Sequence, residues 1–170
     1  AGYLEWDALI DPDPFINGTF SITNTATSTQ TFTVNFTLDS SVQFAQSLMN
    51  GAFSGTLTDA NGDGSASIGR TSGSAGFYSA FIDGNLVRSL GSSAYGYSGA
   101  AFGSAQVGPE SFAPVVGPAL NTTIGLQFRF TLSAGDSVSF SSLFNVVDVP
   151  APGALALLAA AGRMGSRRRH

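Results

Sequence analysis

Apolar and polar residues alternate along most of this chain with a period of two. The alternation is cleanest over residues 123–133 (TIGLQFRFTLS) and residues 31–39 (TFTVNFTLD). A period of two places successive side chains on opposite faces of an extended strand. No segment before Val149 keeps a helical apolar stripe for more than about two turns. We therefore predict an all-β body, with further strands at Phe20 and Ile22, Phe53 and Leu57, Phe77 and Phe81, and Val138 and Phe140.

Turn signals separate the predicted strands. Asp83-Gly84-Asn85 lies between FYSAFI and LVRSL and predicts a tight hairpin, because Gly and Asn accept the positive φ that such turns require. Residues 133–136 (SAGD) are predicted to join the last two strands in the same manner, and residues 24–30 to join the second and third. About eight strands at a spacing of roughly 10 residues predict an antiparallel β-sandwich of the jelly-roll or immunoglobulin-like kind. A barrel is the alternative.

Two segments depart from the alternation. Residues 91–121 are rich in Gly, Ser and Pro, and we interpret them as a long loop with one or two short edge strands. Residues 11–14 (DPDP) are interpreted as a turn near the N-terminus rather than as a catalytic pair of Asp11 and Asp13.

Composition excludes most catalytic chemistry. The 170 residues form one ordinary domain with a tail, and they include no Cys and a single His, His170, at the end of the chain. Cysteine nucleophiles, disulfides, Cys/His zinc sites and a Ser-His-Asp triad are therefore not expected. Glu5 and Glu110 are the only glutamates, which leaves few carboxylate pairs for sugar hydrolysis. We predict that the protein is not an enzyme.

Charge is distributed unevenly along the chain. All 11 acidic residues lie at or before Asp148, where the only basic residues are Arg70, Arg88 and Arg129, because the chain contains no Lys. Such a body has no basic patch to neutralise phosphates, so nucleic-acid binding is not expected. An acidic surface rich in Ser, Thr and Gly suits a protein outside the cytoplasm, and the start Ala1-Gly2-Tyr3 is interpreted as the product of signal-peptide removal.

The C-terminal residues 149–170 form a tail that is distinct from the body, residues 1–148. A Pro-rich break, Val149-Pro150-Ala151-Pro152, precedes an apolar segment predicted as a short helix, Gly153–Ala161, and a basic cluster, Arg167-Arg168-Arg169. The 18 residues from Val149 to Ser166 span about 27 Å as a helix, just short of a ~30 Å hydrocarbon core. They predict transient membrane contact, with the arginines resisting translocation. The alternative is an amphipathic or disordered basic tail.

This tail resembles the PEP-CTERM sorting signal of exported bacterial proteins. Pro150-Ala151-Pro152 has Ala where the family motif has Glu, and Arg163 interrupts the apolar part. The resemblance implies export, recognition and cleavage by an exosortase-type membrane protease, and residence at the cell surface or in an extracellular polysaccharide matrix. It implies no enzymatic activity. Short segments of the body, such as TDANGDG, FIDG and LSAGDS, also resemble segments of the secreted proteins that carry this signal.

One loop has the ligand order of a calcium site. Asp59, Asn61 and Asp63 carry side-chain oxygens at alternate positions, with Gly64 and the Ser65 carbonyl following. An EF-hand would need Glu where Arg70 stands, so this is not an EF-hand. Two interpretations stay open: a Ca²⁺ loop between two strands, or an Asp/Asn/Gly turn whose side chains bond to their own backbone.

The alternative functions rest on aromatic residues and strand edges. Tyr95 and Tyr97, with Tyr3 and Trp6, are candidates for stacking on sugar rings of an extracellular polysaccharide. Alternatively, Trp6 lies in the core of the first strand and the two tyrosines only hold their loop. A sugar platform requires exposed, coplanar rings on one face. Thr-rich strands without Lys also leave edges poorly protected, so a self-assembling structural subunit is a third hypothesis.

Overall fold

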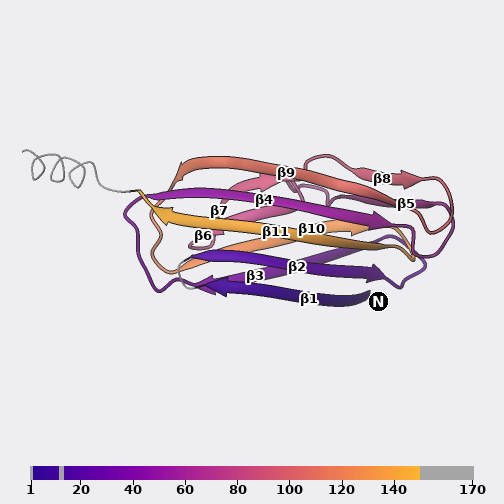
Figure 1. Cartoon of the computed structure of the whole chain (residues 1–170), viewed down its shortest axis with the longest axis horizontal. Helices are drawn as coiled ribbons and strands as arrows, with labels where there is room; N and C mark the ends of the chain where they lie inside the picture. Colours follow the sequence, from indigo (N-terminus) through magenta and orange to yellow (C-terminus); the bar gives the residue numbers. More distant parts are fainter. Residues whose placement is uncertain (1, 12–13, 150–170) are drawn as a thin grey trace, which may run out of the picture.

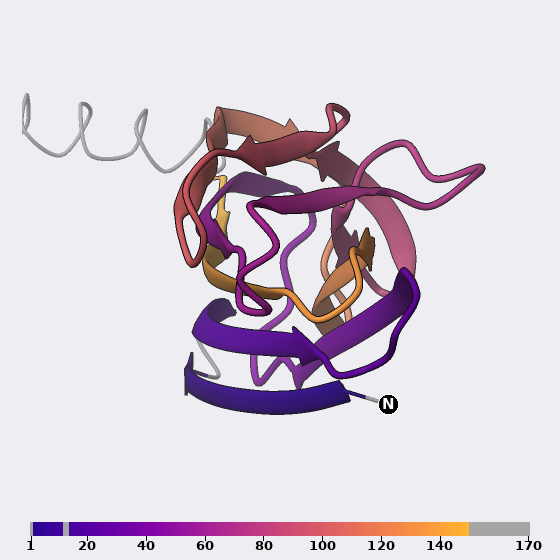
Figure 2. The same ribbon diagram turned by 90° about the vertical axis from the view of Figure 1, so that its right-hand side faces the viewer.

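The computed structural model describes residues 2–11 and 14–149, which form eleven strands in two antiparallel sheets (Figure 1). Viewed from its end, the molecule is two layers around a filled centre (Figure 2). Sheet A has the order β1-β2-β11-β4-β9, with strands Gly2–Asp11, Phe15–Asn24, Ser137–Asp148, Ser47–Thr58 and Ser104–Gly117. The strands of sheet B are β3 (Gln30–Asp39), β5 (Ser65–Arg70), β6 (Tyr78–Ile82), β7 (Asn85–Leu90), β8 (Tyr95–Ser98) and β10 (Thr123–Leu132).

Strand β10 organises sheet B. It pairs along its whole length with β3 on one side. On the other side it pairs with β6 over residues 124–128 and with β5 over residues 130–132. Beyond these two, β6 pairs with β7 and β5 pairs with β8. The strand with the cleanest alternation in the sequence is therefore the one that lies innermost, with its apolar face buried from Ile124 to Leu132.

Phenylalanine rings fill the space between the sheets. Phe20, Phe53, Phe128 and Phe140 are all at most 3% exposed. The Phe128 ring lies 4.9 Å from that of Phe20 and 5.0 Å from that of Phe140, measured between centroids. Each such contact stabilises the fold by about 0.5–1.5 kcal/mol beyond simple burial. These ring contacts join sheet A to sheet B at the centre of the core.

The predicted all-β antiparallel sandwich is confirmed, and so is the hairpin at residues 83–85. Asp83 and Gly84 have φ of 50° and 76°, the two positive values that a tight turn between β6 and β7 requires. The turn at residues 133–136 joins β10 to β11 as predicted, but not as a hairpin, because these strands belong to different sheets. Residues 24–30 join β2 to β3 as predicted, and these two strands also belong to different sheets.

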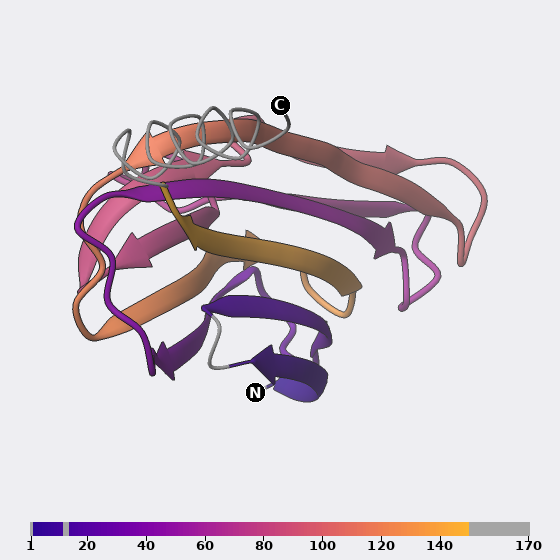
Figure 3. The same ribbon diagram turned by 60° about the vertical axis from the view of Figure 1, so that its left-hand side comes forward.

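Two local predictions are wrong. Phe81 does not share the buried face of Phe77, because β6 begins at Tyr78 and buries Tyr78, Ala80 and Ile82 instead. Residues 91–121 contain the long edge strand β9 rather than short strands alone. Its pairing with β4 has two register shifts, which interrupt the alternation, and an edge strand tolerates proline. Figure 3 shows β9 and β4 side by side along the molecule.

The two long sides of the sandwich differ. On one side Glu110 of β9 links the sheets: its carboxylate accepts hydrogen bonds from the Gly91 backbone N–H (2.8 Å) and the Tyr95 hydroxyl (2.7 Å). On the other side, β1 and β3 are the outermost strands, and Trp6 of β1 is 65% exposed.

The tail that resembles a sorting signal lies almost wholly outside the described residues, including its predicted helix, Pro150, Ala151, Pro152 and the three terminal arginines. Val149 is described, and its N–H donates to the Gln46 carbonyl at 3.2 Å. Over the described ranges, no helix has the length and apolar character needed to cross a membrane.

Candidate functional site

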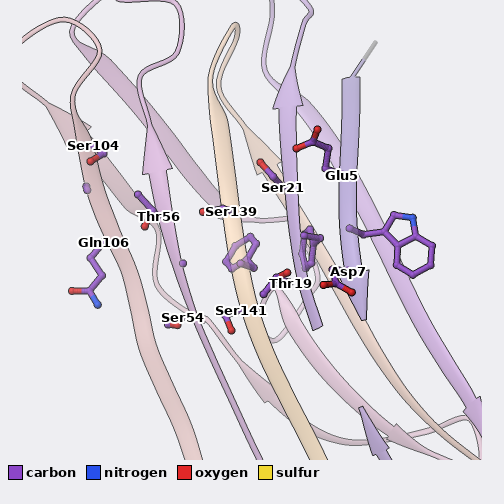
Figure 4. A pocket seen from close by; sticks show the side chains of 15 residues that line it. Glu5, Asp7, Thr19, Ser21, Ser54, Thr56, Ser104, Gln106, Ser139 and Ser141 are labelled. Carbon is purple, nitrogen blue, oxygen red and sulfur yellow. The ribbon is translucent and has the colours of Figure 1, made fainter. Parts of the chain in front are cut away.

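A trough of about 780 Å³ crosses the outer face of sheet A, the face turned away from the core. Figure 4 shows the side chains that line it, which come from all five strands of the sheet. The polar members are short hydroxyl side chains in the middle, with carboxylates at one margin and an amide at the other: Thr19, Ser21, Ser54, Thr56, Ser104, Ser139, Ser141, Glu5, Asp7 and Gln106.

The register of the strands arranges these side chains in rows. In one row Ser21 faces Glu5 on one side and Ser139 on the other, and Thr56 lies between Ser139 and Gln106. The second row runs from Asp7 through Thr19 and Ser141 to Ser54. Neighbouring strands are about 4.8 Å apart, so the five-strand row is about 19 Å long. The row presents a hydroxyl, amide or carboxylate group at each strand.

The alternation of the strands explains why this face is polar. On β2 and β11 the inward positions carry Phe20, Ile22, Val138 and Phe140, so the residues between them point outward. The outward residues in the centre of the trough are Ser and Thr, whose short side chains leave a hollow on the surface of the sheet. Beneath it, Gly55 leaves room for the Phe140 ring, since a Cβ there would lie 2.8 Å from that ring.

The trough is acidic. Glu5 and Asp7 are the charged residues that line it. Arg70, Arg88 and Arg129 all lie on strands of sheet B. Tyr3 shares the outer face of β1 with Glu5, is 61% exposed, and donates a hydrogen bond from its hydroxyl to Glu5 Oε1 at 3.1 Å. This hydrogen bond, together with the Glu5 charge, raises the pKa of the Tyr3 phenol.

The lining groups suit hydrogen bonding to a polar ligand. Each Ser or Thr hydroxyl both donates and accepts hydrogen bonds, and Gln106 does the same through its amide. The two carboxylates accept only, when ionised. Such a surface matches a ligand that is itself a dense array of hydroxyl groups.

The structure places Tyr95 and Tyr97 in sheet B, apart from the trough, and packs both against the core. Burial, followed by the hydrogen bond to Glu110, raises the pKa of Tyr95 to about 12. The Tyr97 hydroxyl donates to the Ala100 carbonyl at 2.8 Å. These contacts agree with the interpretation that the two tyrosines hold their loop.

Tyr3 and Trp6 do not form a common platform. They are separated by three positions on β1, so their side chains leave opposite faces of the strand. The expectation that Trp6 lies in the core is wrong, since it is 65% exposed. It is on the core side of β1, paired with Phe20, but β1 is the edge strand of sheet A, so the side chain is open to solvent on that side.

The candidate calcium residues lie together in the turn between β4 and β5. The Asp59 carboxylate is buried and accepts backbone hydrogen bonds from Gly62 (2.8 Å), Asp63 (3.2 Å), Gly64 (2.8 Å) and Phe102 (3.0 Å). Asn61 donates to Asp63 Oδ2, and Asp63 Oδ1 accepts from Ser65. These bonds are those of an Asp/Asn/Gly turn. Across residues 2–11 and 14–149, no three or more His, Cys, Asp and Glu side chains gather as a metal site would require.

The comparisons leave the family open. No protein-family model matches the chain, and a search of curated proteins finds no significant match. The trough residues were not singled out from the sequence. Their signal is the near-exclusive use of Ser and Thr at the polar positions of FSGTLT, SVSFSS and TFSIT.

Proposed function

We propose that this protein is an exported, non-catalytic component of the cell surface or extracellular matrix that binds polysaccharide in the trough on sheet A. The observation that carries the binding proposal is the double row of hydroxyl groups on β2, β11 and β4, flanked by the carboxylates of β1 and the Gln106 amide of β9. Each hydrogen bond contributes about 0.5–1.5 kcal/mol net. Several hydrogen bonds formed at the same time to the hydroxyl groups of one polysaccharide therefore add up to a favourable binding free energy.

Charge narrows the class of polysaccharide. The trough contains Glu5 and Asp7, and the three arginines among the described residues lie on the other sheet. A polysaccharide rich in carboxylates or sulfates would be repelled at such a surface. The proposed ligand is a neutral glycan, whose hydroxyls donate to the two carboxylates at the margin and exchange hydrogen bonds with the Ser and Thr rows.

The tail supports the export part of the proposal. Its Pro150-Ala151-Pro152 motif, apolar segment and terminal arginines resemble the PEP-CTERM signal, so we propose sorting by an exosortase-type protease after transient membrane contact of a short apolar helix. We also propose that the sandwich is of the jelly-roll or immunoglobulin-like kind. Bound Ca²⁺ at Asp59, Asn61, Asp63 and Ser65 is not part of the proposal, because the Asp59 carboxylate already accepts four backbone hydrogen bonds.

Co-sedimentation with insoluble polysaccharides tests the binding proposal. Neutral glucans, mannans and xylans are compared with acidic alginate and pectate. The variant Ser139→Ala with Ser141→Ala removes two central hydroxyls of the trough. We expect it to weaken binding to the neutral glycan about tenfold or more, since two hydrogen bonds are lost.

The matched control is Ser79→Ala with Ser89→Ala, which removes a facing pair of hydroxyls from β6 and β7 in sheet B. It should bind as the unmodified protein does. Equal retention of both double variants would refute the trough as the site, and retention on acidic polysaccharides alone would refute the neutral-glycan assignment.

A further inference from the structure

The side of the sandwich between β1 and β3 leaves part of the core uncovered. Leu4 and Trp6 pair with Ile22 and Phe20 and lie on the same, core-facing side of sheet A. Ile22 and Phe20 are each 3% exposed, whereas Leu4 is 46% and Trp6 is 65% exposed. The difference arises because β1 and β3 are the edge strands of the two sheets, so the space between them is open to solvent along this side. Large apolar side chains that face inward therefore remain in water.

These side chains border an apolar groove of about 250 Å³. Leu4 and Trp6 of β1 form one wall, and residues 34–37 of β3 form the other. Phe36 of β3 is only partly buried, although it faces the core. Covering the groove would remove Trp6 and Phe36 from water, which is favourable in proportion to the apolar surface that is buried.

Strand β3 is an edge without the usual protection. In the part of the chain that the structure describes, it pairs with β10 alone, over ten residues and without a register shift. Residues 30–38 contain no charged residue and no proline. Soluble proteins normally guard an edge strand with Lys, Pro or a bulge, because its free N–H and C=O groups otherwise pair with another strand.

The other edges are guarded. Strand β9 has two prolines and two register shifts in its pairing, β7 carries Arg88 and a register shift, and β8 is only 4 residues long. Strand β1 carries Glu5 and Asp7, and two antiparallel copies of it with the same faces aligned would set these carboxylates opposite one another. Among these edges β3 is the one whose chemistry favours pairing with itself.

We propose that two copies of this chain associate through antiparallel pairing of their β3 strands, centred on Val34. In this register Phe32 faces Phe36 of the second copy, and Thr33 faces its Asn35. Apolar residues stay on the core side and no like charges oppose one another, while Asp39 lies beyond the paired segment. Sheet B then continues through both copies, and the two grooves join, which buries Trp6 at the contact. This inference does not depend on the polysaccharide proposal.

Sedimentation and fluorescence of the 170-residue chain test this dimer. We expect a mass twice the monomer's 17.4 kDa at high concentration. Trp6 is the only tryptophan, so its emission should shift to shorter wavelength as the concentration rises. Asn35→Lys, at the centre of the proposed contact, should weaken association at least about tenfold and remove the concentration-dependent shift, because it places a charge at the paired edge.

The control is Ser98→Lys, an exposed outward residue on β8, another edge strand of sheet B. It should dimerise as the unmodified chain does. Far-UV circular dichroism and the thermal midpoint of each variant establish that the fold is retained. A chain that stays monomeric with unchanging Trp6 emission, or a dimer that Asn35→Lys leaves intact, would overturn the proposal.

Discussion

Asp83 accepts a hydrogen bond of 2.7 Å from the backbone N–H of Thr122, which ties the β6–β7 hairpin to the segment that enters β10. The same carboxylate also accepts hydrogen bonds from the backbone N–H groups of Asn121 (2.9 Å) and Thr123 (3.0 Å). Partial burial acts to raise the pKa of Asp83, but these hydrogen bonds outweigh it, and the net pKa lies well below the ordinary value.

Asp83→Asn should therefore destabilise the protein at neutral pH by about 1–2 kcal/mol, because Asn keeps one acceptor oxygen and loses the other, and solvent screens a partly exposed site. Asn also tolerates the positive φ at this turn, so backbone strain is not added. The lowered pKa stabilises the folded state above about pH 4, and this contribution is lost as the pH falls through the folded pKa. Urea unfolding at several pH values should show the difference between the two proteins shrinking on acidification; a constant difference would contradict the assignment.

The pKa of Asp136 is raised, in contrast to that of Asp83. It is 1% exposed, its Oδ1 has no hydrogen-bond partner, and its Oδ2 accepts a hydrogen bond from Ser133. Burial raises the pKa of Asp136 despite that hydrogen bond, and the charges of Asp63 and Asp59 raise it further. The folded state thus holds this proton more tightly than the unfolded chain, so stability falls as the pH rises from about 4 through the folded pKa.

Asp136→Asn should remove this loss, giving a protein at least as stable as the unmodified one at about pH 8, where the buried carboxylate would otherwise be ionised. Urea midpoints measured from roughly pH 4 to pH 8 check it. A larger destabilisation by Asp136→Asn at the alkaline end than at the acid end would show that the ionised carboxylate stabilises the fold.

Glu110 links the two sheets through Gly91 and Tyr95, and its removal should be visible in both stability and titration. Glu110→Gln leaves one acceptor oxygen for two donors, which should cost about 1–2 kcal/mol in the free energy of unfolding. Without the carboxylate charge, the pKa of Tyr95 should also fall from about 12 toward its ordinary value. Ultraviolet titration of tyrosinate measures this directly, with Tyr95→Phe identifying the affected transition.

The proposed sorting makes a prediction about mass. Protein recovered from the medium or surface matrix of its native host should end near Pro150 to Pro152, because the resemblance implies cleavage there. Intact-mass spectrometry of cytoplasmic, membrane and extracellular fractions measures the C-terminus in each. A cytoplasmic species that ends at His170 would contradict export and sorting.

The sequence predicted what depends on local alternation and missed what depends on pairing between distant segments. Strand β10 follows from its own residues, since every second position from Ile124 to Leu132 is buried. The trough does not, because Ser21, Ser139 and Thr56 become neighbours only when β2, β11 and β4 pair in one register. The prediction for Trp6 failed for a related reason: its position in the strand is inward, but β1 is an edge strand of sheet A and the groove between β1 and β3 is open to solvent.

Chemical-shift mapping tests directly whether the outer face of sheet A binds a neutral glycan, as we propose. Titration of the ¹⁵N-labelled protein with soluble neutral oligosaccharides should shift the backbone amides of Thr19, Ser54, Thr56, Ser139 and Ser141, while those of β6 and β7 stay unchanged. Ser139→Ala with Ser141→Ala should need about tenfold more ligand for the same shifts. Shifts confined to sheet B, or none with any neutral oligosaccharide, would show that the trough on sheet A is not a binding site for neutral glycans.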